Sequence, residues 1–123
     1  MAKILIVDDD PALRELLKDM LEFDQHEVVM AETGMEALTK LRSGRFQLAI
    51  LDFDMPLLNG RETLKLVRRD PNLFKLPVLM CTAHNKMSEI DDAFEDGANG
   101  YVVKPFDWPT LQKTVIKALS KSI

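Results

Sequence analysis

The chain has 123 residues, 46% of them hydrophobic and 29% charged, which is an ordinary composition for one globular domain. Its formal net charge of −4 argues against direct binding of nucleic acid, and its single cysteine, Cys81, excludes an internal disulfide. The first apolar run, residues 4–7, is too short for a signal peptide or a membrane span. We therefore expect one cytoplasmic domain over residues 1–123, without membrane insertion.

Short apolar runs alternate with helical patterns along the chain. Uninterrupted apolar segments predict buried strands at residues 4–7, 28–31, 48–51, 77–81 and 101–103. After them, apolar residues at helical spacing predict helices that begin at Pro11, after Thr33, near Arg61, at Ser88 and at Trp108, the last ending near Lys121. This alternation is typical of a parallel sheet covered on both faces. We expect an α/β fold with a doubly wound sheet and five helices; right-handed crossovers leave few topologies, one of which is the flavodoxin-like order 2-1-3-4-5.

Several of these helices have recognisable amino-terminal signals. Four side chains are suited to cap them: Asp10, Thr33, Ser88 and Asp107. Thr33 and Glu36 form the pattern of a capping box. In the helix over 88–95, we expect Ile90 and Phe94 to face the core.

Acidic residues follow the two strands that this order makes neighbours. Asp8 and Asp9 follow the first strand, and Asp52 follows the third, at the edge where open α/β folds bind ligands. Two such charges about 4 Å apart repel by roughly 4 kcal/mol at an effective dielectric of about 20. A hard divalent cation such as Mg²⁺ relieves this conflict and can share its site with phosphate. Asp8 and Asp9 are therefore candidate metal ligands, and Asp52 is a candidate ligand and nucleophile for a phosphoryl group. The alternative, that Asp8 to Asp10 only cap a helix, accounts for one acid of the three.

Two further polar residues lie at neighbouring strand ends. Thr82 follows the fourth strand and Lys104 follows the fifth. A phosphoryl group on Asp52 would carry about two negative charges. Lys104 could balance that charge and Thr82 could donate a hydrogen bond, although a lysine at a strand end is usually only solvated.

The order and spacing of these motifs resemble the receiver domain of bacterial two-component response regulators over essentially the whole chain. The resemblance lies in Ile-Leu-Ile-Val-Asp-Asp-Asp at 4–10, Leu-Asp-Phe-Asp-Met-Pro at 51–56, Asn59-Gly60, Thr82-Ala83 and Gly-Tyr-Val-Val-Lys-Pro-Phe at 100–106. It implies that Asp52 receives a phosphoryl group from a sensor histidine kinase or a phosphotransfer protein. It also implies a Mg²⁺ site, for which Mn²⁺ could substitute, formed by Asp9, Asp52 and the backbone carbonyl of Asp54, with help from Asp8.

The resemblance also implies a switch. Lys104 would contact the phosphoryl oxygens, Thr82 would move toward them, and Tyr101 would turn inward into the space that Thr82 leaves. The Lys104–Pro105 bond is expected to be cis. The output surface would be the helix over 88–95, the strand over 101–103 and the last helix, which would bind a downstream protein. The protein would not be an enzyme beyond phosphorylating and dephosphorylating itself.

Two rim positions, Asp54 and His84, are variable in this family and are candidate modulators of the phosphoryl group. His84 could equally be an exposed loop residue.

The spacing of Asp52 and Asp54 also resembles the motif of haloacid-dehalogenase-like phosphatases, but the missing cap domain and the Asp8-Asp9 pair argue against that alternative. Another alternative is the amino-terminal receiver of a longer, DNA-binding regulator. We interpret Cys81 as a buried apolar residue and His26 as a surface residue.

Overall fold

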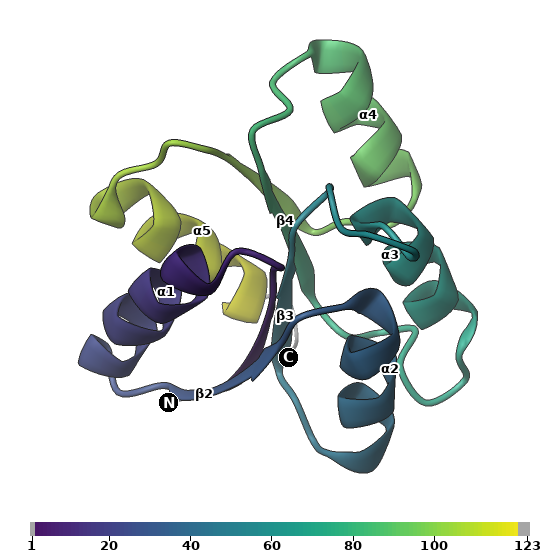
Figure 1. Cartoon of the computed structure of the whole chain (residues 1–123), viewed down its shortest axis with the longest axis horizontal. Helices are drawn as coiled ribbons and strands as arrows, with labels where there is room; N and C mark the ends of the chain where they lie inside the picture. Colours follow the sequence, from purple (N-terminus) through teal and green to yellow (C-terminus); the bar gives the residue numbers. More distant parts are fainter. Residues whose placement is uncertain (1, 121–123) are drawn as a thin grey trace.

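Five parallel strands form one sheet at the centre of the computed structural model, which describes residues 2–120 (Figure 1). The strands are β1 (Lys3–Val7), β2 (Glu27–Ala31), β3 (Leu48–Leu51), β4 (Val78–Thr82) and β5 (Gly100–Val103). The helices are α1 (Pro11–Phe23), α2 (Gly34–Ser43), α3 (Gly60–Arg69), α4 (Met87–Glu95) and α5 (Trp108–Ser120). The order β2-β1-β3-β4-β5 confirms the predicted fold class. The predicted end of the last helix near Lys121 lies outside the described residues.

The sheet is covered on both faces, as the unbroken apolar strands predict. In Figure 1, α1 and α5 lie on one side of the sheet, and α2, α3 and α4 lie on the other. Side chains of β1 alternate between the two cores, with Leu5 and Val7 on the α2–α3 side and Ile4 and Ile6 on the α1–α5 side. This alternation follows from the period of two in a strand, and it explains why no polar residue interrupts β1 or β3.

The strand register brings the candidate site residues to one edge. Val7 of β1 pairs with Leu51 of β3, and the backbone N–H of Asp52 donates to the carbonyl of Val7 at 2.9 Å. The ladder therefore continues one residue past β3. On the other side, the N–H of Lys104 donates to the carbonyl of Thr82 at 2.8 Å. Main-chain hydrogen bonds thus hold both ends of the site.

Three of the four predicted caps, Asp10, Thr33 and Asp107, accept hydrogen bonds from backbone N–H groups at the starts of their helices. The carboxylate of Asp10 accepts hydrogen bonds from the N–H groups of Ala12 and Leu13, and Asp107 accepts one from Thr110 at 2.8 Å. These bonds satisfy amide groups that have no partner inside the first helical turn.

The Thr33 capping box forms only in part. Thr33 accepts from the N–H of Glu36 at 3.1 Å, but the carboxylate of Glu36 accepts from the N–H of Glu32 instead of Thr33. A complete box occurs at α3, where Asn59 and Glu62 bond each other's backbone N–H groups. That box starts α3 at Gly60, one residue earlier than predicted.

The predictions for α4 were wrong at two residues. The helix begins at Met87, after an amino-cap residue, Lys86, that makes no side-chain cap hydrogen bond, so Ser88 is not the cap. Phe94 is 45% exposed, and Ala93 is the fully buried residue of this helix. Because α4 packs on the core through Ala93, the side chain of the neighbouring Phe94 points toward solvent. Strand β4 also includes Thr82, which was predicted to follow it.

Candidate functional site

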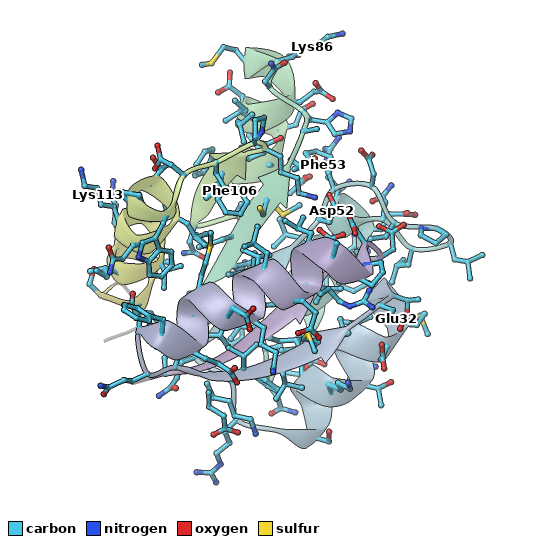
Figure 2. The ribbon with its side chains drawn as sticks, turned by 60° about the vertical axis from the view of Figure 1, so that its left-hand side comes forward. Glu32, Asp52, Phe53, Lys86, Phe106 and Lys113 are labelled. Carbon is cyan, nitrogen blue, oxygen red and sulfur yellow. The ribbon has the colours of Figure 1, made fainter. Side chains whose placement is uncertain are left out.

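Three carboxylates meet at the carboxyl end of the sheet. Asp8 and Asp9 follow β1 and Asp52 follows β3, and each offers an oxygen within 4.8 Å of the others. Asp8 and Asp52 are only 2% and 7% exposed, whereas Asp9 is exposed. Figure 2 shows Asp52 and Phe53 together at this edge of the molecule. The strand order therefore brings together the acids that the sequence analysis selected.

The electrostatics of this cluster favour added positive charge. Burial, followed by the neighbouring carboxylate of Asp8, raises the pKa of Asp52 to about 6 against the opposing effect of Lys104. The donor set consists of three carboxylates, which suits a hard divalent cation such as Mg²⁺. The residues present therefore fit the predicted metal.

Lys104 reaches this cluster from the end of β5. Its ammonium lies 2.9 Å from Oδ2 of Asp8 and 3.5 Å from Oδ1 of Asp52. Burial disfavours the charged lysine, but the hydrogen bond to Asp8 and the charge of Asp52 raise its pKa above the ordinary value. The following Lys104–Pro105 bond is cis, as expected. One ammonium thus lies between two buried carboxylates.

Thr82 is the last residue of β4 and is completely buried. Its hydroxyl oxygen accepts a hydrogen bond from the backbone N–H of His84 at 3.3 Å. Tyr101 of β5 is half-buried, and its hydroxyl donates to the carbonyl of His84 at 2.9 Å. Thr82 and Tyr101 therefore both hold the loop between β4 and α4 at its main chain.

His84 links the two loops beside the acid cluster. Its Nε2 lies 2.7 Å from a carboxylate oxygen of Asp54, and its Nδ1 lies 2.5 Å from the carboxylate of Glu89 on α4. We call these three residues the His84 bridge. The hydrogen bond to Asp54, followed by that to Glu89, raises the pKa of His84 against the effect of burial. The imidazole also lies against the ring of Phe53, with centroids 4.9 Å apart.

The bridge bears on the interpretation of His84 as an exposed loop residue. The side chain is 32% exposed and is paired at both ring nitrogens, so it is not a free loop histidine. Asp54 turns its carboxylate to this bridge, while its backbone N–H donates to Asp52 at 3.4 Å. No sequence signal identifies Glu89 as a partner, because a spacing of five residues across a loop and a helix start matches no regular contact.

Two residues outside the site complete the comparison with the sequence. Cys81 is buried, and burial raises the pKa of its thiol to about 12, so it is an apolar core residue. His26, predicted on the surface, is half-buried and accepts a hydrogen bond from the N–H of Ala2. Among the described helices, none has the length and apolar character needed to cross a bilayer.

Known proteins share this fold and these motifs. Chemotaxis protein CheY-3 of Vibrio cholerae is 39% identical over 120 residues, covering 97% of this chain and 92% of the relative. Chemotaxis protein CheY of Pseudomonas aeruginosa is 40% identical and covers 97% of both chains.

Solved structures agree with the sequence relatives. The chain superposes on chemotaxis protein CheY4 of Vibrio cholerae with a TM-score of 0.91 at 36% identity, covering 96% of this chain and 98% of that one. Response regulator TrrA of Thermotoga maritima, solved in complex with Mg(2+)-BeF, gives a TM-score of 0.86 at 37% identity, with coverage of 96% and 99%. A family model described as the response regulator receiver domain matches residues 4–116. The chain therefore belongs to the response regulator receiver family of two-component signalling, in which phosphorylation of an aspartate is characteristic.

Proposed function

We propose that residues 1–123 form one receiver domain in which Asp52 accepts a phosphoryl group from the phosphohistidine of a sensor histidine kinase or a phosphotransfer protein. The observation that carries this proposal is the position of Asp52. Its buried carboxylate lies beside Asp8 and 3.5 Å from the ammonium of Lys104. The cluster holds more negative than positive charge, which suits a site that completes itself with a cation and a phosphoryl group.

The transfer would break the nitrogen–phosphorus bond of the donor and form an oxygen–phosphorus bond to Asp52. Positioning and charge neutralisation provide most of the catalysis of such a step. When bound by Asp8, Asp9, Asp52 and the backbone carbonyl of Asp54, Mg²⁺ or Mn²⁺ would neutralise charge on the phosphoryl oxygens. The backbone N–H of Asp54, which donates to Asp52, keeps the nucleophilic carboxylate oriented.

Lys104 and Thr82 would respond to the new charge. The ammonium of Lys104, now shared between Asp8 and Asp52, would turn to the phosphoryl oxygens. The Thr82 hydroxyl accepts a hydrogen bond from the chain and so has its own proton to donate. Its movement would pull on the loop at His84, to which Tyr101 is also bonded, and Tyr101 would turn inward.

The proposed output surface is formed by α4, β5 and α5. Phosphorylation adds contacts that one conformation satisfies better than the other, and so it shifts the balance between them. Because the loop from Thr82 leads directly into α4, a change at the acceptor reaches this helix through the His84 bridge. The partner would be a downstream protein, and the chain would bind no nucleic acid itself.

Asp54 and His84 are proposed to set the lifetime of the aspartyl phosphate. The bridge holds the carboxylate of Asp54 beside the acceptor, where it can order or repel the water that hydrolyses the phosphoryl group. Equal dephosphorylation rates for wild type and Asp54→Ala would reject this role.

The phosphatase alternative needs Asp54 as a free acid or base, whereas its carboxylate is paired with His84. We propose instead that the chain turns over no free substrate and only phosphorylates and dephosphorylates itself. It would act in the cytoplasm, either alone or as the amino-terminal receiver of a longer regulator that binds DNA. The reading frame beyond Ile123 separates these two contexts.

Intact-mass measurement after incubation with acetyl phosphate and Mg²⁺ tests the proposal. We expect the wild type to gain one phosphoryl group and Asp52→Asn to gain none. Asp19→Asn, which removes an exposed carboxylate from α1, is the control and should be modified like the wild type. Equal modification of wild type and Asp52→Asn would overturn the assignment of the acceptor.

A further inference from the structure

The basic residues of this acidic protein are concentrated at the end of the sheet opposite Asp52. Two stretches, 41–47 and 68–77, lie at the amino ends of β3 and β4. They contain five of the 16 lysines and arginines but only one acid, Asp70; the five are Arg42, Arg45, Arg68, Arg69 and Lys75. The net charge of the whole chain is −4, so this end is a local reversal of sign. Such a reversal attracts anionic partners.

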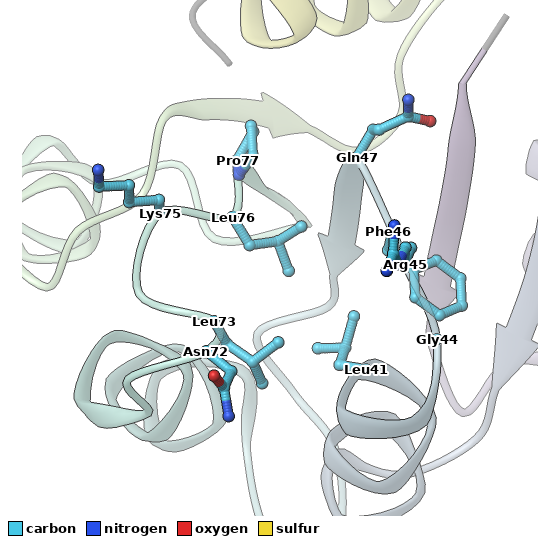
Figure 3. A pocket seen from close by; sticks show the side chains of 10 residues that line it. All are labelled: Leu41, Gly44, Arg45, Phe46, Gln47, Asn72, Leu73, Lys75, Leu76 and Pro77. Atoms are coloured by element: carbon cyan, nitrogen blue, oxygen red, sulfur yellow. The ribbon is translucent and has the colours of Figure 1, made fainter. Parts of the chain in front are cut away.

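A groove lies between these two stretches. It has a volume of about 480 Å³, and its floor is formed by Leu41, Leu73 and Leu76. Arg45 and Lys75 line its margin. Figure 3 shows the three leucine side chains converging on the cavity, with Arg45 and Lys75 on opposite sides of it. We call this feature the basic groove.

The two cations at its margin are available to a ligand. Both are exposed, and neither forms an ion pair with a carboxylate within residues 2–120. Lys75 lies 5.6 Å from the ring centre of Phe74, its own neighbour in the chain. By contrast, Arg42 is paired with the one acid of this region, Asp70, at 3.1 Å. Both cations at the margin of the cavity are therefore unpaired, as is the exposed Arg69 outside its lining, among the residues that the structure describes.

The lining favours an aliphatic side chain over a nucleic-acid base. Bases bind to proteins largely by stacking on aromatic faces. The aromatic residue in this lining is Phe46, and the ammonium of Lys3 lies 4.8 Å from its ring centre, over one face. The other large apolar side chains of the lining are three leucines and a proline, which pack against aliphatic groups.

We propose that the basic groove is a docking site for an acidic segment of a partner protein. An aliphatic side chain of that segment packs on the floor of three leucines, and flanking carboxylates pair with Arg45 and Lys75. The site lies at the opposite end of the sheet from Asp52. It can therefore be occupied while the acceptor is being phosphorylated or while α4, β5 and α5 bind another protein.

A titration of the ¹⁵N-labelled, unphosphorylated protein tests this proposal. The probe is an acetylated and amidated peptide of sequence Asp-Asp-Leu-Leu-Asp-Asp. We expect saturable amide shifts at Gly44, Arg45 and Phe46 and in the segment from Leu73 to Lys75. A peptide with serine in place of leucine, and one with asparagine in place of aspartate, should each bind more weakly. Rising salt should weaken binding as well, because exposed charges are screened.

Two variants of equal charge provide the decisive comparison. Arg45→Gln combined with Lys75→Gln should raise the Kd about fivefold, since two exposed ion pairs are lost. Lys113→Gln combined with Lys117→Gln removes the same charge from α5, beside a smaller cavity near Phe94, and should leave the Kd unchanged. No shifts at millimolar peptide, shifts confined to α5, or an equal Kd in the groove variant would each overturn the proposal. Tighter binding of oligothymidine than of the peptide at the same residues would overturn the assigned class of partner.

Discussion

Charged groups are withdrawn from water at two centres of the protein, around Arg68 and around Asp52. The two centres differ in how far neighbouring groups compensate the lost hydration. Around Arg68 of α3, five hydrogen bonds to oxygens of Phe74, Leu76, Gly97 and Asn99 occupy all the N–H groups of the guanidinium. Around Asp52, the carboxylates of Asp8 and Asp52 share one ammonium. The first centre has all its hydrogen bonds within the chain, whereas the second keeps more negative than positive charge.

The Arg68 centre stabilises the fold, whereas the Asp52 centre is suited to binding a ligand. Arg68 ties the loop before β4 to the loop before β5, and every acceptor it uses is an uncharged oxygen of the chain. Asp52 instead carries a charge that its surroundings disfavour, which is why burial raises its pKa. A group that is destabilised in the resting protein can gain from binding a cation or a phosphoryl group.

The largest expected change in stability follows from removing the guanidinium of Arg68. Arg68→Met should lower the free energy of unfolding by about 3 kcal/mol, because it leaves several carbonyl oxygens without their donors. Urea denaturation measures this change. Arg69→Met, on the exposed neighbour in α3, is the matched control and should change stability by less than about 0.5 kcal/mol. Equal losses for the two variants would show that the Arg68 contacts are not stabilising.

Removal of the charged group at the Asp52 centre should stabilise the protein instead of destabilising it. Asp52→Asn should raise the free energy of unfolding by about 2 kcal/mol at neutral pH without divalent cations, since it removes the disfavoured charge. The carboxyl pKa rises from 3.8 to about 6 on folding, so the folded wild type binds the extra proton between these values. The gain should therefore be absent below pH 3.8, grow through this window and be complete above about pH 6. Mg²⁺ should stabilise the wild type and reduce the gain.

Asp19→Asn serves as the control here too, since its exposed carboxylate should give neither the gain nor its pH dependence. A destabilised Asp52→Asn protein at pH 7 would contradict the view that the acceptor carries a disfavoured charge.

A smaller effect is expected at Gly97, which presents its carbonyl to Arg68. Gly97 has a φ of 110°, and a Cβ there would lie 2.8 Å from Nε of Arg68. Gly97→Ala should cost about 1.5 kcal/mol, partly from the backbone and partly from this collision. In the Arg68→Met background the cost should shrink, because methionine lacks the hydrogen bonds that fix Arg68 against Gly97 and can move aside. A cost that is the same in both backgrounds would assign it to the backbone alone.

The smallest effect is expected at the His84 bridge, where the charged groups are partly exposed. The pKa of His84 is raised above 6.5 by Asp54 and Glu89, so its stabilising contribution is complete below pH 6.5 and is lost as the pH rises through the raised value. The difference in unfolding free energy between wild type and His84→Gln should follow this trend, within about 1 kcal/mol. His26→Gln should show the reverse trend, because burial lowers the pKa of His26.

The sequence was sufficient where a residue's role depends on its own segment. Unbroken apolar runs identify the strands, because both faces of a central strand pack against apolar cores. The acids at 8, 9 and 52 and the lysine at 104 follow directly from those strand ends, so the strand order alone brings them together.

The rest depends on contacts between distant segments. Arg68 has the sequence signature of an exposed helical arginine, and only the folded loops before β4 and β5 supply its acceptors. Glu89 and the basic groove were missed for the same reason. The error at Ser88 arose because serine is a favoured capping residue, but here it is the second residue of α4 and Lys86 occupies the cap position. Phe94 was misplaced because α4 packs through a single small residue.

The hydrogen bond from Asp52 to Val7 has a consequence for the resting protein in the cell. Because it extends the ladder between β1 and β3 beyond their last paired residues, the acids on either side cannot drift apart to ease their repulsion. The ammonium of Lys104 relieves part of this repulsion, and a divalent cation from outside the polypeptide would relieve more of it as its free concentration rises, through the ordinary linkage of binding to folding. The melting temperature of this protein should therefore rise with the concentration of free divalent cation.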